Sequence, residues 1–355
     1  MRINVLVPGI AVSGGMRVIF EYANGLVSRG HRVTLVCPTS LDRTEGREPF
    51  KKRLGRWGRY LFADRRVGWF DLRAKLHVVP DLRPRHIPPA DLTIATWWRT
   101  AEALAECGPQ AGTPLYFVQG YEIWAGPRER VESTYRLPMR KLVVASWLRR
   151  LLIERFGQEP GEVRGPMISG VNFSLFYNDR KVFRDPPTIG MIYRPVTWRG
   201  TQDGLQAFER VRAKHPKVRL LMFGHEWPTI EAPEDVEYHR DPPQPRLREF
   251  YSSCEIWVNP SWHEGLPLPP MEAMACQSAL VTTDVGVEDY VIPGVTALVV
   301  PPRDPDALEQ AILRLIEDPA LLQSLARAGY EHIKAFTWDK AVQHFEAELL
   351  DAVGR

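Results

Sequence analysis

Short apolar runs alternate with helix-like segments along most of this chain, and this alternation limits the folds that are open to it. Residues 3–7 read as a strand, residues 17–29 carry apolar side chains at helical spacing, and residues 32–37 read as the next strand. A strand, a helix and a second strand in this order form the unit from which parallel sheets are built. The sequence therefore predicts an α/β fold with parallel sheets.

The same alternation runs in two series, one in each half of the chain. The first half carries further expected strands at 92–95, 115–118 and 142–144. A second series begins near Thr188, with strands at 188–193, 219–223, 256–259, 279–282 and 297–300 and helices at 202–214, 306–316, 319–335 and 338–353.

Between the two series lies a stretch rich in Gly, Asn, Asp and Pro, which suits a hinge. We therefore predict two doubly wound domains that face each other across a cleft. The first covers 1–170 and the second 188–335, joined by a linker over 171–187. A chain of 355 residues has a suitable length for two domains.

The composition excludes several other classes of protein. The formal net charge of +3 says little about partners, and no apolar run approaches the roughly 18 residues of a membrane span. We expect no leader peptide, because the chain opens directly on a strand. The four cysteines form no C-x-x-C pair, so reduced thiols and a cytoplasmic location are expected.

The most informative segment is SWHEGLPLPPMEAMA, residues 261–275, which follows a strand and opens a helix. Glu264 falls in the loop and Glu272 on the helix, and ligands bind at this edge of open α/β sheets. The amides of Gly265 and Leu266 can hold an anion, while a carboxylate accepts hydrogen bonds from sugar hydroxyls. The alternative is a helix start with solvated acidic side chains.

This segment resembles the E-x7-E signature of the retaining glycosyltransferases of family 4, which have the GT-B fold, and residues 286–304 agree as well. The resemblance implies that Glu272 binds the ribose of a nucleotide-sugar donor and that Glu264 contacts the transferred sugar. It also implies that Gly265 and Leu266 contact the donor. Pro267 belongs to this donor-side loop and stands where the family has glycine.

The resemblance further implies how the reaction and the domains are organised. Transfer proceeds with retention of configuration, without a metal and without a cofactor, since the nucleotide sugar is itself a substrate. The donor binds to the second domain and the acceptor to the first. The helix at 336–355 crosses back to the first domain.

A second candidate site is YRPVTWRG, residues 193–200, at the end of the second domain's first strand. Its two cations, Arg194 and Arg199, suit a diphosphate, because guanidinium groups bind phosphate oxygens in pairs. Members of family 4 usually carry Arg and Lys at these two positions. The alternative is an exposed basic loop.

Two further candidates follow strands of the first domain. Gly14 and Gly15 would allow close approach of a backbone to phosphate or sugar, and the family places a similar pair near the donor phosphates and the acceptor. Their spacing is not G-x-G-x-x-G, which argues against a dehydrogenase. Gln119 stands near where many relatives have His, and it can hydrogen-bond a sugar hydroxyl without acting as a base. Glu122 is a weaker candidate, and both can equally be parts of structural turns.

Three remaining features complete the set. His225 lies where relatives place a loop beneath the nucleotide base, although a lone loop histidine is usually solvated. Asp304 precedes Pro305 and an apolar-periodic run, so we interpret it as a helix N-cap and predict no metal site.

Residues 43–85 carry 13 Lys or Arg and five Asp or Glu with interleaved aromatics, which suits either a solvated surface or peripheral contact with an anionic membrane. No nucleic-acid motif accompanies them.

Taken together, these patterns indicate a retaining, metal-independent hexosyl- or deoxyhexosyltransferase. The acceptor is a glycan, a lipid-linked sugar or a small molecule, in the cytoplasm or at the inner face of the membrane. One alternative is a catalytically silent subunit of the same fold that binds a sugar nucleotide or a glycan. Another is an epimerase or phosphorylase of this fold.

Overall fold

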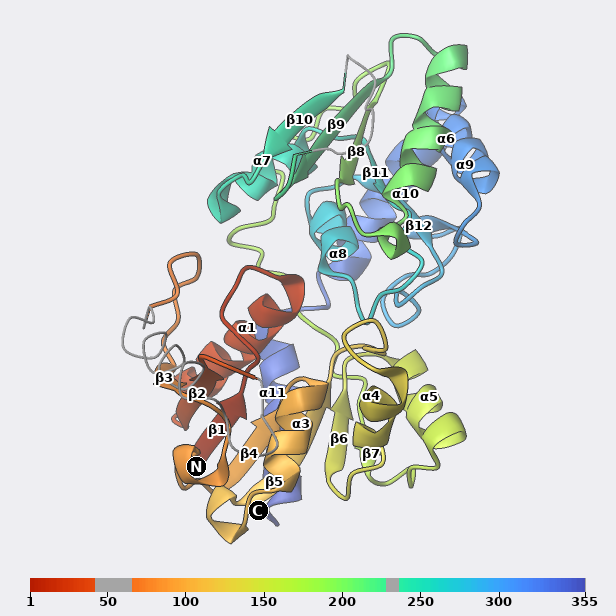
Figure 1. Cartoon of the computed structure of the whole chain (residues 1–355). Helices are drawn as coiled ribbons and strands as arrows, with labels where there is room; N and C mark the ends of the chain where they lie inside the picture. The colour runs from red at the N-terminus through yellow and green to blue at the C-terminus, as the bar shows by residue number, and fades with distance from the viewer. Residues whose placement is uncertain (42–65, 228–235, 355) are drawn as a thin grey trace. The chain divides into compact units, whose positions relative to one another are not determined.

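The computed structural model describes residues 1–41, 66–227 and 236–354, and it divides into two compact units. The first unit contains Met1–Ser169 and Trp338–Arg355, and the second contains Gly170–Thr337. Within the described residues, every pairing between strands is parallel in both sheets. Helices cover each sheet (Figure 1). The predicted α/β fold with parallel sheets is confirmed.

The first unit has a sheet in the order β3-β2-β1-β4-β5-β6-β7. The order reverses between β1 and β4, which is the point where ligands bind in doubly wound folds. The strands are β1 (Arg2–Leu6), β2 (Arg32–Pro38), β3 (Lys75–Val79), β4 (Leu92–Ala95), β5 (Thr113–Val118), β6 (Arg140–Val143) and β7 (Val163–Arg164). In the described part of this unit the α-helices are α1 (Gly14–Ser28), α3 (Trp98–Ala105), α4 (Arg128–Thr134), α5 (Ser146–Phe156) and α11 (Trp338–Ala352).

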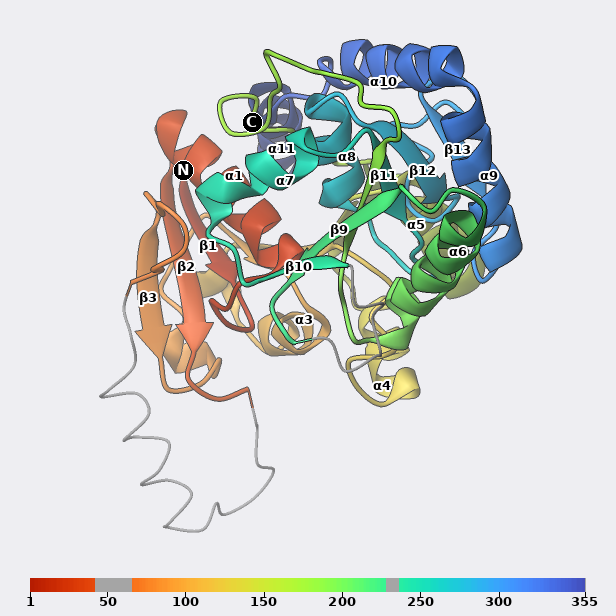
Figure 2. The same ribbon diagram turned by 90° about the horizontal axis from the view of Figure 1, so that it is seen from above.

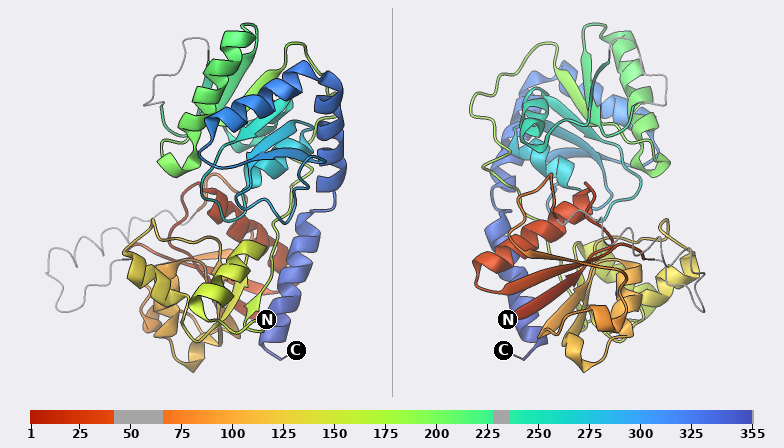
Figure 3. Two further views of the ribbon diagram at one scale, coloured as in Figure 1. Left: turned by 90° about the vertical axis from the view of Figure 1, so that its right-hand side faces the viewer. Right: turned by 60° about the vertical axis from the view of Figure 1, so that its left-hand side comes forward.

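The last helix, α11, belongs to the core of the first unit and packs against α1 (Figure 3). Tyr22 of α1 stacks on Phe345 of α11 with ring centroids 4.4 Å apart. The helices approach so closely at Gly25 that a Cβ there would lie 2.3 Å from Cγ2 of Val342. A small residue in α1 therefore permits the contact that brings the end of the chain into this unit.

The second unit has a sheet in the order β10-β9-β8-β11-β12-β13, with the reversal between β8 and β11. In Figure 2, α6 and α9 lie along one flank of this sheet, and α7 and α8 lie along the other. The strands are β8 (Thr188–Ile192), β9 (Arg219–Gly224), β10 (Glu237–Arg240), β11 (Ile256–Asn259), β12 (Ala279–Thr283) and β13 (Ala297–Val300). The helices are α6 (Thr201–Lys214), α7 (Leu247–Ser252), α8 (Leu268–Ala275), α9 (Pro305–Glu317) and α10 (Pro319–Ile333).

The strand order of the second unit determines which loops meet. In the central pair of strands, Ile189 of β8 lies opposite Ile256 of β11, and both side chains are fully buried in the core. Because β8 and β11 run parallel, their carboxyl ends lie at the same edge of the sheet. The loops that follow them, 193–200 and 260–267, are therefore neighbours although they are distant in the sequence.

The start of α9 has the N-cap that the sequence predicts. Asp304 caps α9, and its carboxylate accepts a hydrogen bond of 2.9 Å from the amide of Ala307, as predicted.

Across the described part of the chain, none of the helices has both the length and the apolar character needed to cross a membrane.

Candidate functional site

The loops after β8 and β11 are bonded to each other. The amides of Trp262 and His263 both donate to the carbonyl oxygen of Trp198, at 2.8 and 3.3 Å. Gly200 has a φ of +65°, and a Cβ at this position would lie 1.9 Å from the carbonyl oxygen of Pro260. Only glycine fits this contact, so the two loops are held in one arrangement.

Two of the predicted site residues meet in this pair of loops. The Arg199 guanidinium forms an ion pair with the Glu264 carboxylate, and both side chains are largely buried. The hydroxyl of Ser261 also donates to Glu264, at 2.9 Å. The carboxylate is therefore oriented by a cation from one loop and by a hydroxyl from its own loop.

Arg194 adds a second cation at the carboxyl end of β8. Burial lowers the pKa of its guanidinium, and the charge of Arg199 lowers that pKa further, while Glu264 and Glu272 raise it. An arginine side chain nevertheless keeps its positive charge. Thr201, the first residue of α6, holds the backbone of Arg194 by accepting from its amide at 3.2 Å and donating to its carbonyl at 2.8 Å. Two arginines and two glutamates thus act on one another electrostatically.

Glu272 lies on α8 and is 6% exposed. The hydroxyl of Tyr251, on α7, donates to Oε2 of Glu272 at 2.7 Å. Because a buried carboxylate without a hydrogen-bond donor is costly, this bond offsets part of the cost of burying Glu272.

The short loop between Glu264 and α8 is fixed by residues of the run that follows β12. Gly286 has a φ of +71°, and a Cβ there would lie 2.7 Å from the carbonyl oxygen of Gly265. Tyr290 donates from its hydroxyl to the carbonyl oxygen of Pro267 at 3.1 Å. Leu266 stands between these two anchored residues and is half-buried.

His225 lies just beyond β9, the strand next to β8. Its Nδ1 is 2.5 Å from Oδ1 of Asp241, and its ring is mostly exposed. Arg240 donates to the carbonyl oxygen of His225 at 3.3 Å. His225 therefore lies at the same sheet edge as the arginines but is anchored to the last residue of β10 and to the residue after it.

In the first unit, the structure brings Gln119 and Gly15 together. Gly14 and Gly15 are the first two residues of α1, and Gln119 directly follows β5. A Cβ at Gly15 would lie 3.5 Å from Oε1 of Gln119, so the amide group covers the backbone of the helix start. These residues form a separate polar group at the carboxyl edge of the first sheet.

Glu122, a weaker candidate for the ligand site, has a buried side chain, whereas a residue that contacts a ligand directly is usually open to the site. Its Oε2 accepts a hydrogen bond of 3.2 Å from the amide of Trp98, the first residue of α3. Burial raises the pKa of this carboxyl group to about 8. The structure thus assigns Glu122 a role in holding the start of α3.

Several residues of the site were missed by the sequence analysis. Trp262 donates from Nε1 to Oδ2 of Asp203 at 2.6 Å, and the guanidinium of Arg303 lies 4.7 Å from the centre of its ring. Ser261 and Tyr251 contact the two glutamates directly. Ser261 and Trp262 lie in the same short segment as Glu264, which was a signal for both, whereas no sequence pattern marked Asp203 or Tyr251.

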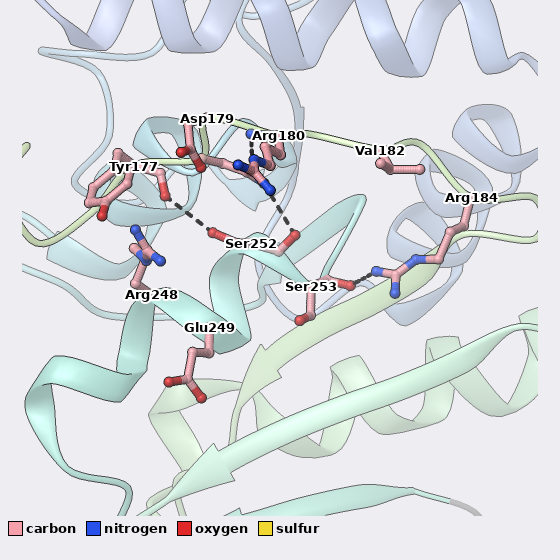
Figure 4. Close-up of a pocket in the computed structure, with 10 residues that line it drawn as sticks. Tyr177, Asp179, Arg180, Val182, Arg184, Arg248, Glu249, Ser252 and Ser253 are labelled. Carbon is pink, nitrogen blue, oxygen red and sulfur yellow. Dashed lines mark hydrogen bonds between the residues drawn. The ribbon is translucent and has the colours of Figure 1, made fainter.

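A concave pocket of about 350 Å³ lies elsewhere on the second unit, between residues 177–184 and α7 (Figure 4). Arg248 covers the ring of Tyr177 at 3.9 Å, and Arg184 forms an ion pair of 3.0 Å with Glu255. None of the residues predicted for the functional site lines this pocket. The chemistry grouped at the ends of β8 and β11 is therefore separate from it.

Two further expectations concern the basic stretch and the absence of a metal site. Of the basic stretch 43–85, residues 43–65 lie outside the described residues, and the remainder includes β3. Among the described residues, no group of three or more His, Cys, Asp or Glu has an arrangement that could hold a metal ion.

Part of the chain matches a known protein family. Residues 186–318 match the model of a family described as "Glycosyl transferases group 1". This range contains both arginines, both glutamates and the loops that carry them. The second unit is therefore similar to the glycosyl transferases of group 1, as the resemblance stated from the sequence predicted.

Curated relatives match over part of their length. D-inositol 3-phosphate glycosyltransferase 1 of Catenulispora acidiphila is 32% identical over 121 residues, which are 34% of this chain and 29% of the relative. The capsular polysaccharide biosynthesis glycosyltransferase CapM of Staphylococcus aureus is 24% identical over 210 residues, 53% of this chain and 55% of the relative. The chain thus spans less than two thirds of the length of these relatives.

Solved structures match over almost the whole chain. Sucrose-phosphate synthase from Thermosynechococcus elongatus has a TM-score of 0.74 at 18% identity, with 99% of this chain and 98% of that chain covered. Anabaena Alr3699/HepE in complex with UDP has a TM-score of 0.75 at 13% identity, covering 99% and 100%. These similarities establish the fold, which is GT-B.

Proposed function

We propose that this chain is a glycosyltransferase that moves a sugar from a nucleotide-diphosphate sugar to a glycan, lipid-linked or small-molecule acceptor. The observation that carries the proposal is the ion pair of Arg199 with Glu264, grouped with Arg194 and Glu272 where the strand order reverses. Ligands of doubly wound folds bind at this point. The UDP complex of the structurally similar Anabaena protein supports a nucleotide as ligand.

Each side chain of the group suits one part of a nucleotide-sugar donor. Arg194 and Arg199 offer guanidinium groups to the diphosphate, while the amides of Gly265 and Leu266 offer further donors. Glu272 would accept hydrogen bonds from the ribose hydroxyls, and Glu264 from the transferred sugar. The donor is then held by charge at its centre and by carboxylates on both sides.

The proposed reaction retains configuration and uses no metal. The bond between the anomeric carbon and the diphosphate oxygen breaks, and a bond from the acceptor oxygen to the same carbon forms. The acceptor proton passes to an oxygen of the departing diphosphate. Arg194 and Arg199 would stabilise the negative charge that develops on this leaving group.

The first unit would hold the acceptor. Gln119 can donate to and accept from a hydroxyl group, and Gly14 and Gly15 let a sugar or phosphate approach the start of α1. We further propose that transfer takes place in the cytoplasm and involves a hexosyl or deoxyhexosyl group. The basic stretch 43–85 would bring the enzyme to an anionic membrane surface when the acceptor is lipid-linked.

The test has a binding part and a chemical part. Thermal unfolding in the presence of UDP-, GDP- and ADP-sugars identifies the donor, since a ligand at a hundred times its Kd stabilises by about 2.7 kcal/mol. Release of nucleoside diphosphate from that donor then measures transfer to water or acceptor. Arg199→Gln should abolish release, whereas Arg210→Gln, an exposed arginine of α6 paired with Asp306, should not. Stabilisation by a donor without release would indicate the silent binding subunit instead.

A further inference from the structure

Tyr251 is joined to Glu272 by a short hydrogen bond that links two helices. The hydroxyl of Tyr251, on α7, lies 2.7 Å from Oε2 of Glu272, on α8. The tyrosine is 1% exposed and the glutamate 6% exposed. A hydrogen bond from a neutral donor to a buried carboxylate is among the stronger ones in proteins, so the contact constrains the acceptor.

The tyrosine itself is held in place by aromatic neighbours. Its ring centroid lies 4.5 Å from that of Trp257 and 5.7 Å from those of Phe223 and Phe176, the last two with edge-on geometry. Close packing on several sides restricts the rotamers that are open to the ring. The hydroxyl group therefore has a fixed position from which to orient the carboxylate.

The backbone on which Tyr251 stands is anchored independently of its hydroxyl. Ser278, just after α8, donates to the carbonyl oxygens of Tyr251 and Cys254 at 2.9 and 2.7 Å. α7 and α8 thus stay joined when the hydroxyl is removed. This separation allows the hydroxyl to be tested without dismantling the site.

We infer that Tyr251 is a positioning residue that orients the Glu272 carboxylate toward the ribose of the bound nucleotide, and that it thereby sets the preference for ribonucleotides over deoxyribonucleotides. The inference rests on the proposed function, in which Glu272 contacts the ribose. The terminal torsion of a glutamate is broad, so an unrestrained carboxylate samples many orientations. The bond from Tyr251 limits that rotation.

The expected consequence is selectivity rather than affinity alone. A buried carboxylate that is oriented toward two ribose hydroxyl groups loses one hydrogen-bond donor when the nucleotide lacks one of these groups. Because a buried acceptor without its donor costs free energy, the deoxynucleotide binds less tightly. When the carboxylate is free to turn toward water, this penalty falls. Removing the Tyr251 hydroxyl should therefore lower the affinity for ribonucleotides more than the affinity for deoxyribonucleotides.

The experiment compares binding of a ribonucleotide and its deoxy forms by calorimetry. UDP, GDP and ADP are tested on the wild type, and the tightest binder is then compared with its 2′-deoxy and 3′-deoxy forms. A lost hydrogen bond to a charged group corresponds to about tenfold or more in affinity, which is the preference expected for the wild type. In Tyr251→Phe we expect that preference to fall to about threefold or less.

A matched control and a second variant make the outcome specific. Tyr22→Phe removes another buried hydroxyl, which donates to the carbonyl of Met167 at 3.1 Å in the first unit, and it should keep the wild-type preference. Glu272→Gln should reduce the preference as Tyr251→Phe does. Because the two residues act through one contact, the double variant should show no further loss.

The possible results separate the inference from the proposed function. Should Glu272→Gln lower the ribose preference while Tyr251→Phe retains it, Tyr251 does not position Glu272, and the inference is overturned while the proposed function stands. Additive losses in the double variant would overturn it as well. Should the wild type show no ribose preference, or Glu272→Gln leave binding unchanged, the assignment of Glu272 to the ribose is itself wrong.

Discussion

The guanidinium of Arg199 and the carboxylate of Glu264 form an ion pair between the loops that follow β8 and β11, two strands that are neighbours only because the strand order reverses there. Ser261 adds a hydroxyl donor to the same carboxylate. A diphosphate at this position would compete with Glu264 for Arg199. The pair therefore couples the proposed phosphate contact to the proposed sugar contact.

Replacing both Arg194 and Arg199 by Gln should weaken diphosphate binding more than monophosphate binding. Each hydrogen bond to a charged group contributes about 1.5–3 kcal/mol, so the combined loss for the diphosphate should reach a hundredfold or more. Calorimetry with a nucleoside diphosphate and the matching monophosphate measures the two losses. Equal losses for both ligands would contradict the assignment of these arginines.

Changing Ser261 to Ala should lower turnover by about tenfold with little change in donor affinity. The hydroxyl orients the Glu264 carboxylate, and the loss of one hydrogen bond to a charged group has about this magnitude. Steady-state release of nucleoside diphosphate provides the measurement. Ser133→Ala removes an exposed hydroxyl bond on α4 and serves as the control. A rise in KM at constant kcat would show that Ser261 contributes to ground-state binding instead.

Gly200→Ala should destabilise the second unit by about 2–4 kcal/mol, because the new Cβ meets the carbonyl oxygen of Pro260 and the backbone has a positive φ. Gly294→Ala is the matched control in the same unit. Gly294 also has a positive φ, +75°, but nothing lies within 4 Å of its Cβ position. Urea unfolding should show a clearly larger loss for the first variant. Similar losses would mean that the backbone conformation, rather than the contact, is responsible.

Glu122 should make the stability of the first unit depend on pH. Burial raises the pKa of its carboxyl group from 4.5 to about 8, so the folded chain binds this proton more tightly than the unfolded chain does. The resulting stabilisation is complete below pH 4.5 and is lost as pH rises through 8. Glu122→Gln removes this dependence and should stabilise the chain relative to wild type at pH 8 more than at pH 5. Urea midpoints at the two pH values test this, and an identical difference at both would refute it.

The basic stretch should bind anionic vesicles at low salt, since each Lys or Arg near such a surface contributes about 1 kcal/mol. Changing Lys51, Lys52, Arg53 and Arg56 to Gln should weaken sedimentation with vesicles of anionic lipid and leave release of nucleoside diphosphate unchanged. Vesicles of neutral lipid are the control. Equal sedimentation with both kinds of vesicle would favour an acceptor in solution.

Local patterns in the sequence were sufficient to predict the class of fold and the segments that carry the site. Strand and helix periodicity, which depends on near neighbours in the chain, predicted β1, α1 and most of the second unit. The predicted N-cap at Asp304 also depends on neighbouring residues alone. By contrast, β10 has the polar sequence EYHR and forms because it pairs with β9, so no local pattern revealed it.

The partners of the site residues were decided only by the tertiary structure. The contacts of Arg199 with Glu264, of Tyr251 with Glu272 and of Gln119 with Gly15 each join residues from different elements. The sequence alone placed glutamates, arginines and glycines at the ends of strands, because the residue type and the preceding apolar run are both local. Which ends adjoin depends on strand order, and strand order is set by packing between distant parts of the chain.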